Sequence, residues 1–538
     1  MASTGYKDTF ARDRLPPQEL LPEIIIDLPE LNYPERINCV AELLDQAVGE
    51  GDGERIAIRW RGGQWTFAQL LERVDSIAHL LIDVLKLETG NRVLLRGSND
   101  PMMAACWLAV VKAGLIAVAT MPLLRARELA KILNKAEVAA ALCDHSLAEE
   151  MRLAQTEAPI LRHILYFNST DNSSVERQTE RCIRGPFSAC DTAADDICLI
   201  AFTSGTSGVP KATMHFHRDI LTITDCFPRS ILHTQRDEVF CGTAPLGFTF
   251  GLGGLLLFPM RYRASTVLLG PINPEALLKA IQDFQATTCF TVPTFYRQMA
   301  PLVPKFDLGS LRKAISAGEA LPLSTAQLWL DSAGVPLIDG IGSTELLHVF
   351  ISASANEIRP GSTGKPIPGY RARVIDSEGR PLPSGEVGRL AVQGPTGCRY
   401  LADGRQKNYV EDGWNITGDA YLVDEDGYFW HKGRIDDMII TSGYNIAGVE
   451  VEEALMKHGA VSECCVVGVP DEIRGQVIKA FVVLKPGYEA SEGLVGILQE
   501  HVKKTIAPYK YPRAITFRTS LPRTETGKLQ RFRLREST

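Results

Sequence analysis

The sequence lacks the cysteine and histidine patterns that usually mark metal sites and disulfide frameworks. Its twelve cysteines include no C-x-x-C pair, and its ten histidines do not cluster at metal-ligand spacing. His215 and His217 are two residues apart, a spacing that does not place them on one face of a helix. The pattern argues against a zinc site, and we expect reduced thiols in a cytoplasmic protein.

An excess of positive charge and a long uninterrupted apolar run are also missing. The formal net charge is −7, whereas a general nucleic-acid binder usually carries a basic excess. Residues 1–23 contain no apolar core of the kind that a signal peptide needs. The most apolar run, residues 101–124, is interrupted by Lys112, Gly114 and Pro122. It predicts a buried helix followed by a buried strand, and we expect neither nucleic acid nor a membrane as a partner.

The chain does have the length and the patterning of a multidomain α/β protein. It has 538 residues, of which 45% are hydrophobic and 22% charged. Strand-like segments at 54–60 and 92–97 flank a helix-like segment at 66–85, with Thr66 as its N-cap. The same alternation returns at 275–293. It predicts parallel sheets covered by helices.

Two changes of composition and pattern divide the chain. Near Gly361 the sequence becomes rich in glycine, proline and short strand-like runs, which predicts a β-rich subdomain over about 361–435. After Asp436 a compact pattern of strands and helices predicts a small α+β domain over 436–538. We therefore expect a large N-terminal domain over residues 1–435, followed by a small mobile domain.

The stretch FTSGTSGVPKATMHFHRD, residues 202–219, concentrates groups that hold phosphate. Gly205 and Gly208 let backbone N–H groups turn toward an anion, and Lys211 adds positive charge. Hydroxyl donors come from Thr203, Ser204, Thr206 and Ser207. The stretch is not a P-loop, because Lys211 follows Pro210 instead of glycine. Taken alone, a flexible surface loop is the alternative.

This stretch resembles the phosphate loop of the adenylate-forming superfamily, which comprises acyl-CoA synthetases, peptide-synthetase adenylation domains and luciferases. The family's other motifs follow in order, and the match spans residues 50 to 538. The other five motifs are ISAGEALP (315–322), DGIGSTE (339–345), WNITGD (414–419), KGRIDD (432–437) and PRTETGK (522–528). Six motifs in one order leave little room for chance.

The resemblance implies that the protein uses ATP, Mg²⁺ and coenzyme A. It implies that Thr344 lies near the α-phosphate, that Glu345 binds the metal and that Lys528 is the catalytic lysine. Adenine would lie along Gly318, Glu319, Ala320, Asp339, Gly340 and Ile341, and ribose would bind Asp419 and Arg434. The family commonly has an aromatic residue where this sequence has Ile341, so aliphatic contact would replace ring stacking.

Each of these residues also has an ordinary interpretation. Glu345 alone is more typical of a charge at a helix N-terminus. Asp419 is compatible with a simple turn after Gly418, and Lys528 with a solvated lysine. The order of the motifs favours the functional interpretation in all three cases.

The chemistry implied by the family needs two half-reactions. A carboxylate first attacks the α-phosphorus of ATP, where negative charge builds up and calls for a metal, hydroxyls and an ammonium group. The thiol of coenzyme A then displaces AMP. The resemblance implies that the small domain rotates about Asp436 between the steps and that Ser442, Gly443 and Tyr444 then line the path of the thiol. Without the resemblance, these segments read as a linker and a surface turn.

The carboxylic acid is expected to be a small aromatic one. By resemblance its pocket is lined by Phe248, Phe250, Gly342 and His348, which supply apolar walls and one polar group; the alternative is that both phenylalanines belong to the core. The stretch DGIGSTELLHVFIS resembles benzoate-type CoA ligases, and the N-terminal residues look like those of 2-aminobenzoate–CoA ligases. This similarity points to an ortho-substituted benzoate such as 2-aminobenzoate or 2-hydroxybenzoate, with plain benzoate as the alternative.

Two other functions stay open at this point. An adenylation enzyme that loads a carrier-protein thiol would share the first half-reaction, and we expect free coenzyme A because no carrier-like segment follows Lys528. A non-catalytic nucleotide sensor would share the fold, but the presence of Lys528, Glu345 and the phosphate loop argues against it. The sequence leaves a monomer and a homodimer open.

Overall fold

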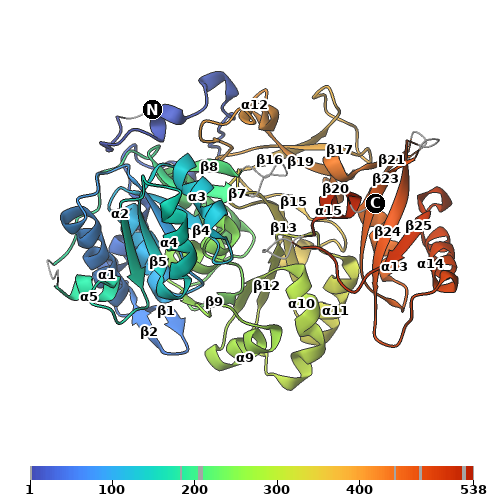
Figure 1. Ribbon diagram of the computed structural model, residues 1–538, viewed down its shortest axis with the longest axis horizontal. Helices are drawn as coiled ribbons and strands as arrows, with labels where there is room; N and C mark the ends of the chain where they lie inside the picture. The colour runs from blue at the N-terminus through green and yellow to red at the C-terminus, as the bar shows by residue number, and fades with distance from the viewer. Residues whose placement is uncertain are drawn as a thin grey trace.

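Two large sheets and the helices around them form most of the molecule (Figure 1). The computed structural model describes residues 3–181, 185–203, 210–441, 444–471, 475–523 and 529–536. The first sheet has the order β6-β5-β3-β4-β7-β8, parallel except at β8. Its strands are β3 (Arg92–Arg96), β4 (Ile116–Thr120), β5 (Val138–Asp144), β6 (His163–Phe167), β7 (Ile197–Thr203) and β8 (Lys211–Phe216).

The second sheet has nine strands in the order β15-β14-β13-β12-β11-β9-β10-β1-β2. Its central strands are parallel, and antiparallel pairs close both edges. The strands are β1 (Ile56–Trp60), β2 (Gly63–Thr66), β9 (Val239–Gly242), β10 (Ser265–Val267), β11 (Thr288–Thr291), β12 (Lys313–Ala317), β13 (Leu337–Gly342), β14 (Val349–Ser352) and β15 (Lys365–Pro366).

Strand side chains alternate between two cores, as a sheet covered on both faces requires. In β3, Leu94 packs with helices α3 and α4, whereas Val93 and Leu95 join the central core between the two sheets. On the far side of the second sheet, α9, α10 and α11 form a third core with every other strand residue, such as Cys289. The helices are α1 (Phe67–His79), α2 (Pro101–Lys112), α3 (Ala126–Lys135), α4 (Ala148–Thr156), α5 (Val175–Arg181), α6 (His217–Ser230), α7 (Thr249–Leu252), α8 (Phe258–Arg261), α9 (Pro274–Phe284), α10 (Pro293–Met299) and α11 (Leu323–Ala333).

The apolar run at 101–124 is a buried helix and a buried strand, as the sequence predicts. Asp100 caps α2 by accepting a hydrogen bond from the N–H of Met102. Lys112 is fully buried, and its ammonium group pairs with Asp45 at 2.6 Å and Asp75 at 2.5 Å. Within the described part of the chain, no helix has the length and apolar character needed to cross a membrane.

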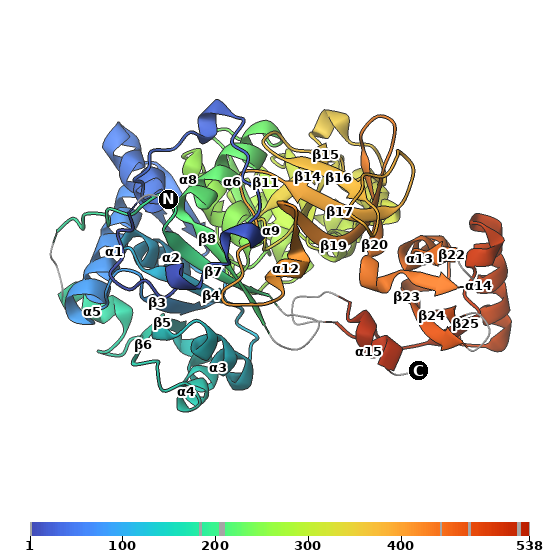
Figure 2. The same cartoon turned by 90° about the horizontal axis from the view of Figure 1, so that it is seen from above.

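A β-rich subdomain and a small domain follow the two large sheets. The subdomain is an antiparallel sheet of β16 (Arg371–Ile375), β17 (Gly388–Gln393), β18 (Val410–Glu411), β19 (Trp414–Val423) and β20 (Phe429–Arg434), with helix α12 (Gln406–Tyr409). The small domain lies at one end of the molecule (Figure 2). It comprises β21 (Ile439–Thr441), β22 (Tyr444–Ile446), α13 (Gly448–Met456), β23 (Val461–Asp471), β24 (Gly475–Leu484), α14 (Glu492–Thr505), β25 (Ala514–Phe517) and α15 (Arg531–Glu536).

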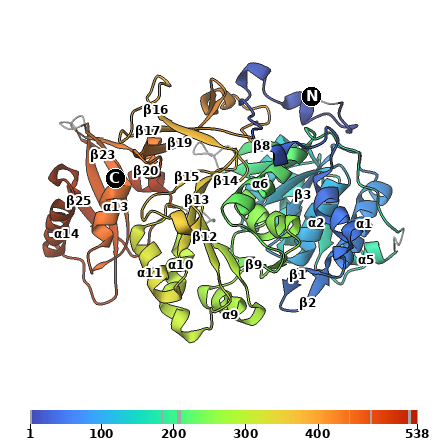
Figure 3. The same cartoon turned by 180° about the vertical axis from the view of Figure 1, so that it is seen from behind.

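The small domain has hydrophobic clusters of its own. Their buried members all lie between Ile439 and Leu534. Its contacts with the large part include α10, where Arg297 donates a hydrogen bond to the carbonyl of Ser462 at 2.8 Å. Figure 3 shows α10 and α11 between the small domain and the end of the molecule that carries α1 and α2.

The N-terminal residues act as a strap across the large part. Arg12 pairs with Asp196 at 3.1 Å, beside the first sheet. Further along, the N–H of Ile25 bonds to the carbonyl of Gly394 at 3.0 Å, in the β-rich subdomain. Residues 3–37, called the N-terminal strap below, therefore connect the first sheet with Gly394, which lies 369 positions after Ile25 in the chain.

Candidate active site

Thr203 and Lys211 lie at the two ends of the predicted phosphate loop. β7 ends at Thr203 and β8 begins at Lys211, and the two residues are paired across the antiparallel ladder. The rest of the predicted loop, Ser204, Gly205, Thr206, Ser207 and Gly208, lies outside the described residues. The strands thus place one hydroxyl and one ammonium group side by side at the point where the loop begins and ends.

The turn that carries Thr344 and Glu345 is held by hydrogen bonds from neighbouring elements. His215 on β8 donates from Nε2 to the carbonyl of Thr344 at 2.8 Å. Thr396 donates from Oγ1 to the carbonyl of Leu346 at 2.8 Å. These bonds fix the backbone on both sides of Glu345, so the carboxylate is presented from a rigid turn.

The Glu345 carboxylate is buried and is bound by a tyrosine that the sequence motifs did not indicate. The hydroxyl of Tyr400 donates to Glu345 Oε1 at 2.6 Å, and Lys211 Nζ donates to the Tyr400 oxygen at 3.2 Å. Burial and the charge of Glu345 raise the pKa of Tyr400 far above its usual value, so the phenol stays protonated. Lys211, Tyr400 and Glu345 therefore form one chain of hydrogen bonds.

The predicted adenine residues lie at the carboxyl ends of two neighbouring parallel strands. β12 and β13 pair in register, with Ser316 opposite Asp339. Gly318 follows β12 with φ of +89°, a conformation that favours glycine. Gly340 and Ile341 lie on β13. Glu319 and the exposed Ala320 follow Gly318. The Glu319 carboxylate accepts a hydrogen bond at Oε2 from Thr294 Oγ1, at 2.6 Å. The strands thus bring both predicted adenine segments to one edge of the sheet.

Asp339 carries an unusual carboxyl group. Its Oδ1 is buried and has no hydrogen-bond partner among the described residues. Burial raises the pKa of this carboxyl to about 7, and the nearby Gly340 N–H and Ser316 offset only part of the rise. A buried oxygen without a donor is a ready acceptor for an amino group.

The predicted ribose pair is formed by neighbouring strands of the β-rich subdomain. Asp419 on β19 lies opposite Arg434 on β20, and Arg434 Nη1 binds Asp419 Oδ1 at 2.9 Å. Gly418 has φ of +77°, and a Cβ there would lie 2.8 Å from the Arg434 guanidinium. Burial and the charge of Glu345 raise the pKa of Tyr409 well above its usual value, so this phenol also stays protonated.

The predicted acid pocket is brought together only in part. His348 is buried against Phe250, with ring centroids 5.7 Å apart, and Nε2 donates to the Phe250 carbonyl at 3.3 Å. Its Nδ1 is buried and has no partner in the described part of the chain. Burial lowers the pKa of His348 to about 3, so the ring is neutral. A Cβ at Gly342 would lie 2.7 Å from the His348 carbonyl, which explains the glycine.

Phe248 is placed differently from Phe250. It precedes α7 as the N-cap residue, and it makes no ring contact with another described residue. Phe250 also packs against Phe290, with centroids 5.6 Å apart. The structure therefore joins Phe250, Phe290 and His348 in one aromatic cluster and leaves Phe248 outside it.

The predicted hinge, the predicted thiol path and the segment of the predicted catalytic lysine are described only in part. Asp436 lies in a short 3-10 turn, Ile435–Asp437, between β20 and β21. Tyr444 begins β22, which pairs with β21. Ser442, Gly443 and Lys528 lie outside the described residues.

Sequence reasoning missed the residues that support the turn at Glu345. His215 lies in the phosphate-loop stretch, but the stretch gives no sign that its side chain supports another segment. Tyr400 and Thr396 lie outside every motif. Their contacts join positions 50 or more residues apart. No local pattern signals such a contact, because it depends on how β8 and the β-rich subdomain meet.

Comparison with known protein families covers nearly the whole chain. A family model described as AMP-binding enzyme matches residues 44–400, and one described as AMP-binding enzyme C-terminal domain matches residues 450–528. The benzoate–CoA ligase of Thauera aromatica is 35% identical over 515 residues, which are 95% of this chain and 98% of that protein.

Solved structures give the same relation. The anthranilate CoA ligase AuaEII in complex with anthranoyl-AMP has a TM-score of 0.88 and 32% identity, over 95% of this chain and 99% of that one. A benzoate CoA ligase from Burkholderia xenovorans LB400 has a TM-score of 0.83 and 30% identity, over 93% of this chain and 100% of that one.

Proposed function

The chain belongs to the AMP-binding enzyme family and is an AMP-forming acid–thiol ligase, and on this premise we propose that it activates a benzoate-type acid and transfers it to coenzyme A. The preferred acid is an ortho-substituted benzoate, with 2-aminobenzoate or 2-hydroxybenzoate foremost. A benzoate–CoA ligase among the relatives supports a benzoate-type acid, with plain benzoate as the alternative, and the relative that binds anthranoyl-AMP supports an ortho substituent.

In the first half-reaction the carboxylate of the acid attacks the α-phosphorus of ATP, and pyrophosphate leaves. Thr203, Lys211 and Thr344 hold the phosphates, and Lys528 neutralises the charge that develops during attack. Asp339 Oδ1, which has no donor among the described residues, accepts a hydrogen bond from the adenine amino group. Asp419 accepts hydrogen bonds from the ribose hydroxyls, with Arg434 holding its carboxylate.

Glu345 fits the role of a metal-binding residue. Its Oε1 is bound by Tyr400, and Oε2 receives no hydrogen bond from any described residue. Mg²⁺ prefers oxygen ligands and is usually held by one or two carboxylates together with substrate phosphates. When bound, the ion would neutralise charge on the phosphates and help orient them.

The acid is recognised by the cluster of Phe250, Phe290 and His348. The observation that carries the ortho-substituted choice is the buried Nδ1 of His348, which has no partner among the described residues. Because Nε2 carries the proton that it donates to Phe250, Nδ1 is an acceptor. It suits the N–H or O–H of an ortho amino or hydroxyl group, and a plain benzoate leaves it unpaired.

A panel of acids tests the proposal. AMP release is measured with ATP, Mg²⁺ and coenzyme A for 2-aminobenzoate, 2-hydroxybenzoate, benzoate, acetate and hexanoate. We expect kcat/KM to be highest for the ortho-substituted acids, and acetate to be poor because it buries little apolar area. A higher kcat/KM for hexanoate than for any benzoate would show that the aromatic assignment is wrong.

The same assay addresses transfer to a carrier-protein thiol. With coenzyme A as the only thiol, formation of aryl-CoA at the rate of AMP release supports the ligase. Accumulation of aryl-AMP without aryl-CoA would point to a missing carrier protein instead.

A further inference from the structure

We propose that Tyr400 is a positioning residue that holds the Glu345 carboxylate, together with Lys211, in the orientation needed to bind the metal–nucleotide complex. This inference rests on the proposed function of Glu345. Tyr400 comes from the segment between β17 and β18, 55 positions from Glu345, and belongs to no motif that indicated the site.

The contact has the geometry of a strong hydrogen bond. The Tyr400 oxygen lies 2.6 Å from Glu345 Oε1, within the range of a hydroxyl bound to a carboxylate. Both side chains are buried, Tyr400 at 1% and Glu345 at 8% exposure. A buried carboxylate is costly without donors, and Tyr400 is the only donor to Glu345 among the described residues.

Lys211 determines the direction of the hydrogen bonds. Its ammonium group has only donors, so the Tyr400 oxygen accepts from Lys211 Nζ at 3.2 Å and must give its own proton to Glu345. The ammonium also lies over the Tyr400 ring, 5.2 Å from its centroid. This arrangement ties Oε1 down and leaves Oε2 available to a cation.

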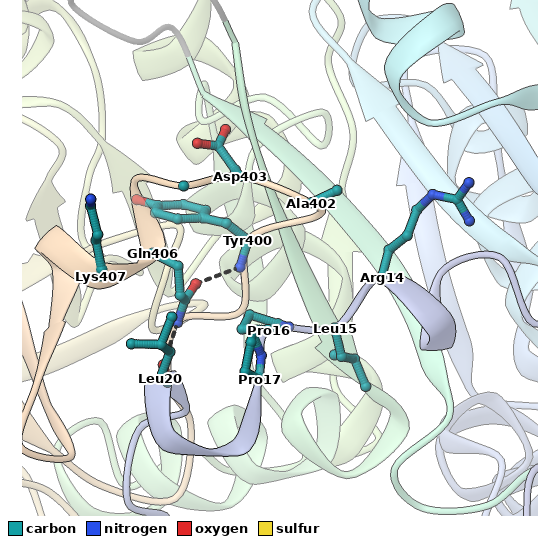
Figure 4. Close-up of a pocket in the computed structure, with 11 residues that line it drawn as sticks. Arg14, Leu15, Pro16, Pro17, Leu20, Tyr400, Ala402, Asp403, Gln406 and Lys407 are labelled. Carbon is teal, nitrogen blue, oxygen red and sulfur yellow. Dashed lines mark hydrogen bonds between the residues drawn. The ribbon is translucent and has the colours of Figure 1, made fainter.

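The phenol itself is fixed from the backbone. Arg399 and Leu401, which flank Tyr400, exchange backbone hydrogen bonds with β8, each at 2.8 Å. The Tyr400 N–H binds Gln406 Oε1 at 2.8 Å, and Gln406 Nε2 donates to the carbonyl of Leu20 in the N-terminal strap at 2.9 Å (Figure 4). The ring therefore has little freedom to follow Glu345 if the carboxylate moves.

The Tyr400 ring is also one wall of a cavity of about 310 Å³ between the strap and the segment that follows β17 (Figure 4). Leu15, Pro17 and Leu20 line the side formed by the strap. The strap thus faces the ring across this cavity and supports it indirectly, through the bond between Leu20 and Gln406.

The test compares Tyr400→Phe with Tyr409→Phe. The Tyr409 ring lies 5.8 Å from that of Tyr400, and its hydroxyl lies 3.3 Å from Ser343 Oγ without binding Glu345, so it is a matched loss of a buried phenol oxygen. Binding of Mn²⁺ is measured by electron paramagnetic resonance in the presence of the α,β-methylene analogue of ATP. This readout does not depend on turnover.

We expect Tyr400→Phe to weaken Mn²⁺ binding by about tenfold or more, as loss of residues that orient metal ligands typically does. Tyr409→Phe should stay within about twofold of the native protein. In the adenylation assay, the Mg²⁺ concentration for half-maximal rate should rise in Tyr400→Phe, and added Mg²⁺ should restore part of the rate.

Glu345→Gln tests the metal-binding role of Glu345 separately from the positioning role of Tyr400. If Glu345→Gln abolishes Mn²⁺ binding while Tyr400→Phe binds as tightly as the native protein, the positioning role of Tyr400 is wrong and the proposed function stands. If Glu345→Gln binds Mn²⁺ normally, the metal-binding role of Glu345 is wrong, and the inference falls with it. Equal loss of affinity in Tyr400→Phe and Tyr409→Phe would reduce Tyr400 to a packing residue and would also overturn the inference.

Discussion

At the scale of single residues, the free nitrogen of His348 is the feature most directly tied to substrate choice. We expect His348→Ala to narrow the ratio of kcat/KM between 2-aminobenzoate and benzoate by about tenfold, since one good hydrogen bond of ~1.4 kcal/mol is lost. Because the pKa of His348 is lowered to about 3, the native ratio should not change between about pH 6 and about pH 8. A similar loss for both acids would mean that His348 shapes the pocket without reading the substituent.

Asp339 makes stability depend on pH at the same scale. Its pKa is raised to about 7 from an ordinary value of 3.8, so the folded protein keeps this proton when the unfolded chain has lost it. The stabilisation is fully present below about pH 3.8 and is lost as the pH rises through about 7. Asp339→Asn, which removes the charge, should therefore raise the free energy of unfolding at pH 8 by on the order of 4 kcal/mol.

The two proteins should approach each other in stability toward pH 4, where the native carboxyl is protonated. The measurement is the shift of the denaturant midpoint with pH for both proteins. A constant difference across the pH range would show that Asp339 does not titrate as its burial implies.

At the scale of elements, the mostly buried guanidinium of Arg531 helps to hold α15 to the small domain, together with Leu534 and the pair of Arg535 with Asp437. Arg531 binds both oxygens of Glu452 on α13, with one contact at 2.9 Å, and its Nη1 donates to the carbonyl of Val466 at 3.0 Å. Arg531→Met would leave Glu452 without this partner and should lower the free energy of unfolding by about 3 kcal/mol. Calorimetry of the full chain measures this effect.

Arg533 provides the control on the same helix, because it is exposed. Arg533→Met should change stability by less than about 0.5 kcal/mol. Should both variants lose the same stability, the effect would come from helix propensity or surface charge and not from the Arg531–Glu452 pair.

The elements themselves follow from local sequence, whereas their meeting points do not. The helix at α1 is fixed by an apolar spacing and by Thr66, which caps it as predicted. Buried strands such as β3 and β4 were predictable from runs of apolar residues. The contact of Tyr400 with Glu345 was not predictable, because it depends on the register with which residues 399–401 pair with β8. The resemblance implies that Phe248 and Phe250 both line the acid pocket, and the structure shows that Phe250 alone of the two packs in the aromatic cluster with Phe290 and His348.

At the scale of the whole molecule, the proposed rotation about Asp436 should separate the two half-reactions. Proline at this position would lock φ and restrict Ile435 before it. No backbone hydrogen bond from the Asp436 N–H is found in the described structure, so the fold should tolerate the change. We expect Asp436→Pro to form aryl-AMP at a near-native rate and to make aryl-CoA at least tenfold more slowly.

Two further variants serve as controls for Asp436→Pro. Asp436→Ala keeps the backbone free and should retain both half-reactions. Lys528→Ala should show the reverse defect, losing aryl-AMP formation while converting supplied aryl-AMP to aryl-CoA. Native rates of aryl-CoA formation in Asp436→Pro would place the pivot elsewhere in the chain.

The N-terminal strap also has a consequence for the order in which the protein is made. Leu20 docks on Gln406, 386 residues later in the chain. At a synthesis rate of about 5–20 residues per second, roughly 20–80 s pass between the emergence of the two residues from the ribosome. For about the second half of that time, after β8 has emerged, the first sheet has all its strands, but the strap has no Gln406 on which to close. A nascent chain halted before residue 406 should therefore expose the part of the strap around Leu20 to proteases, and a finished chain should protect it.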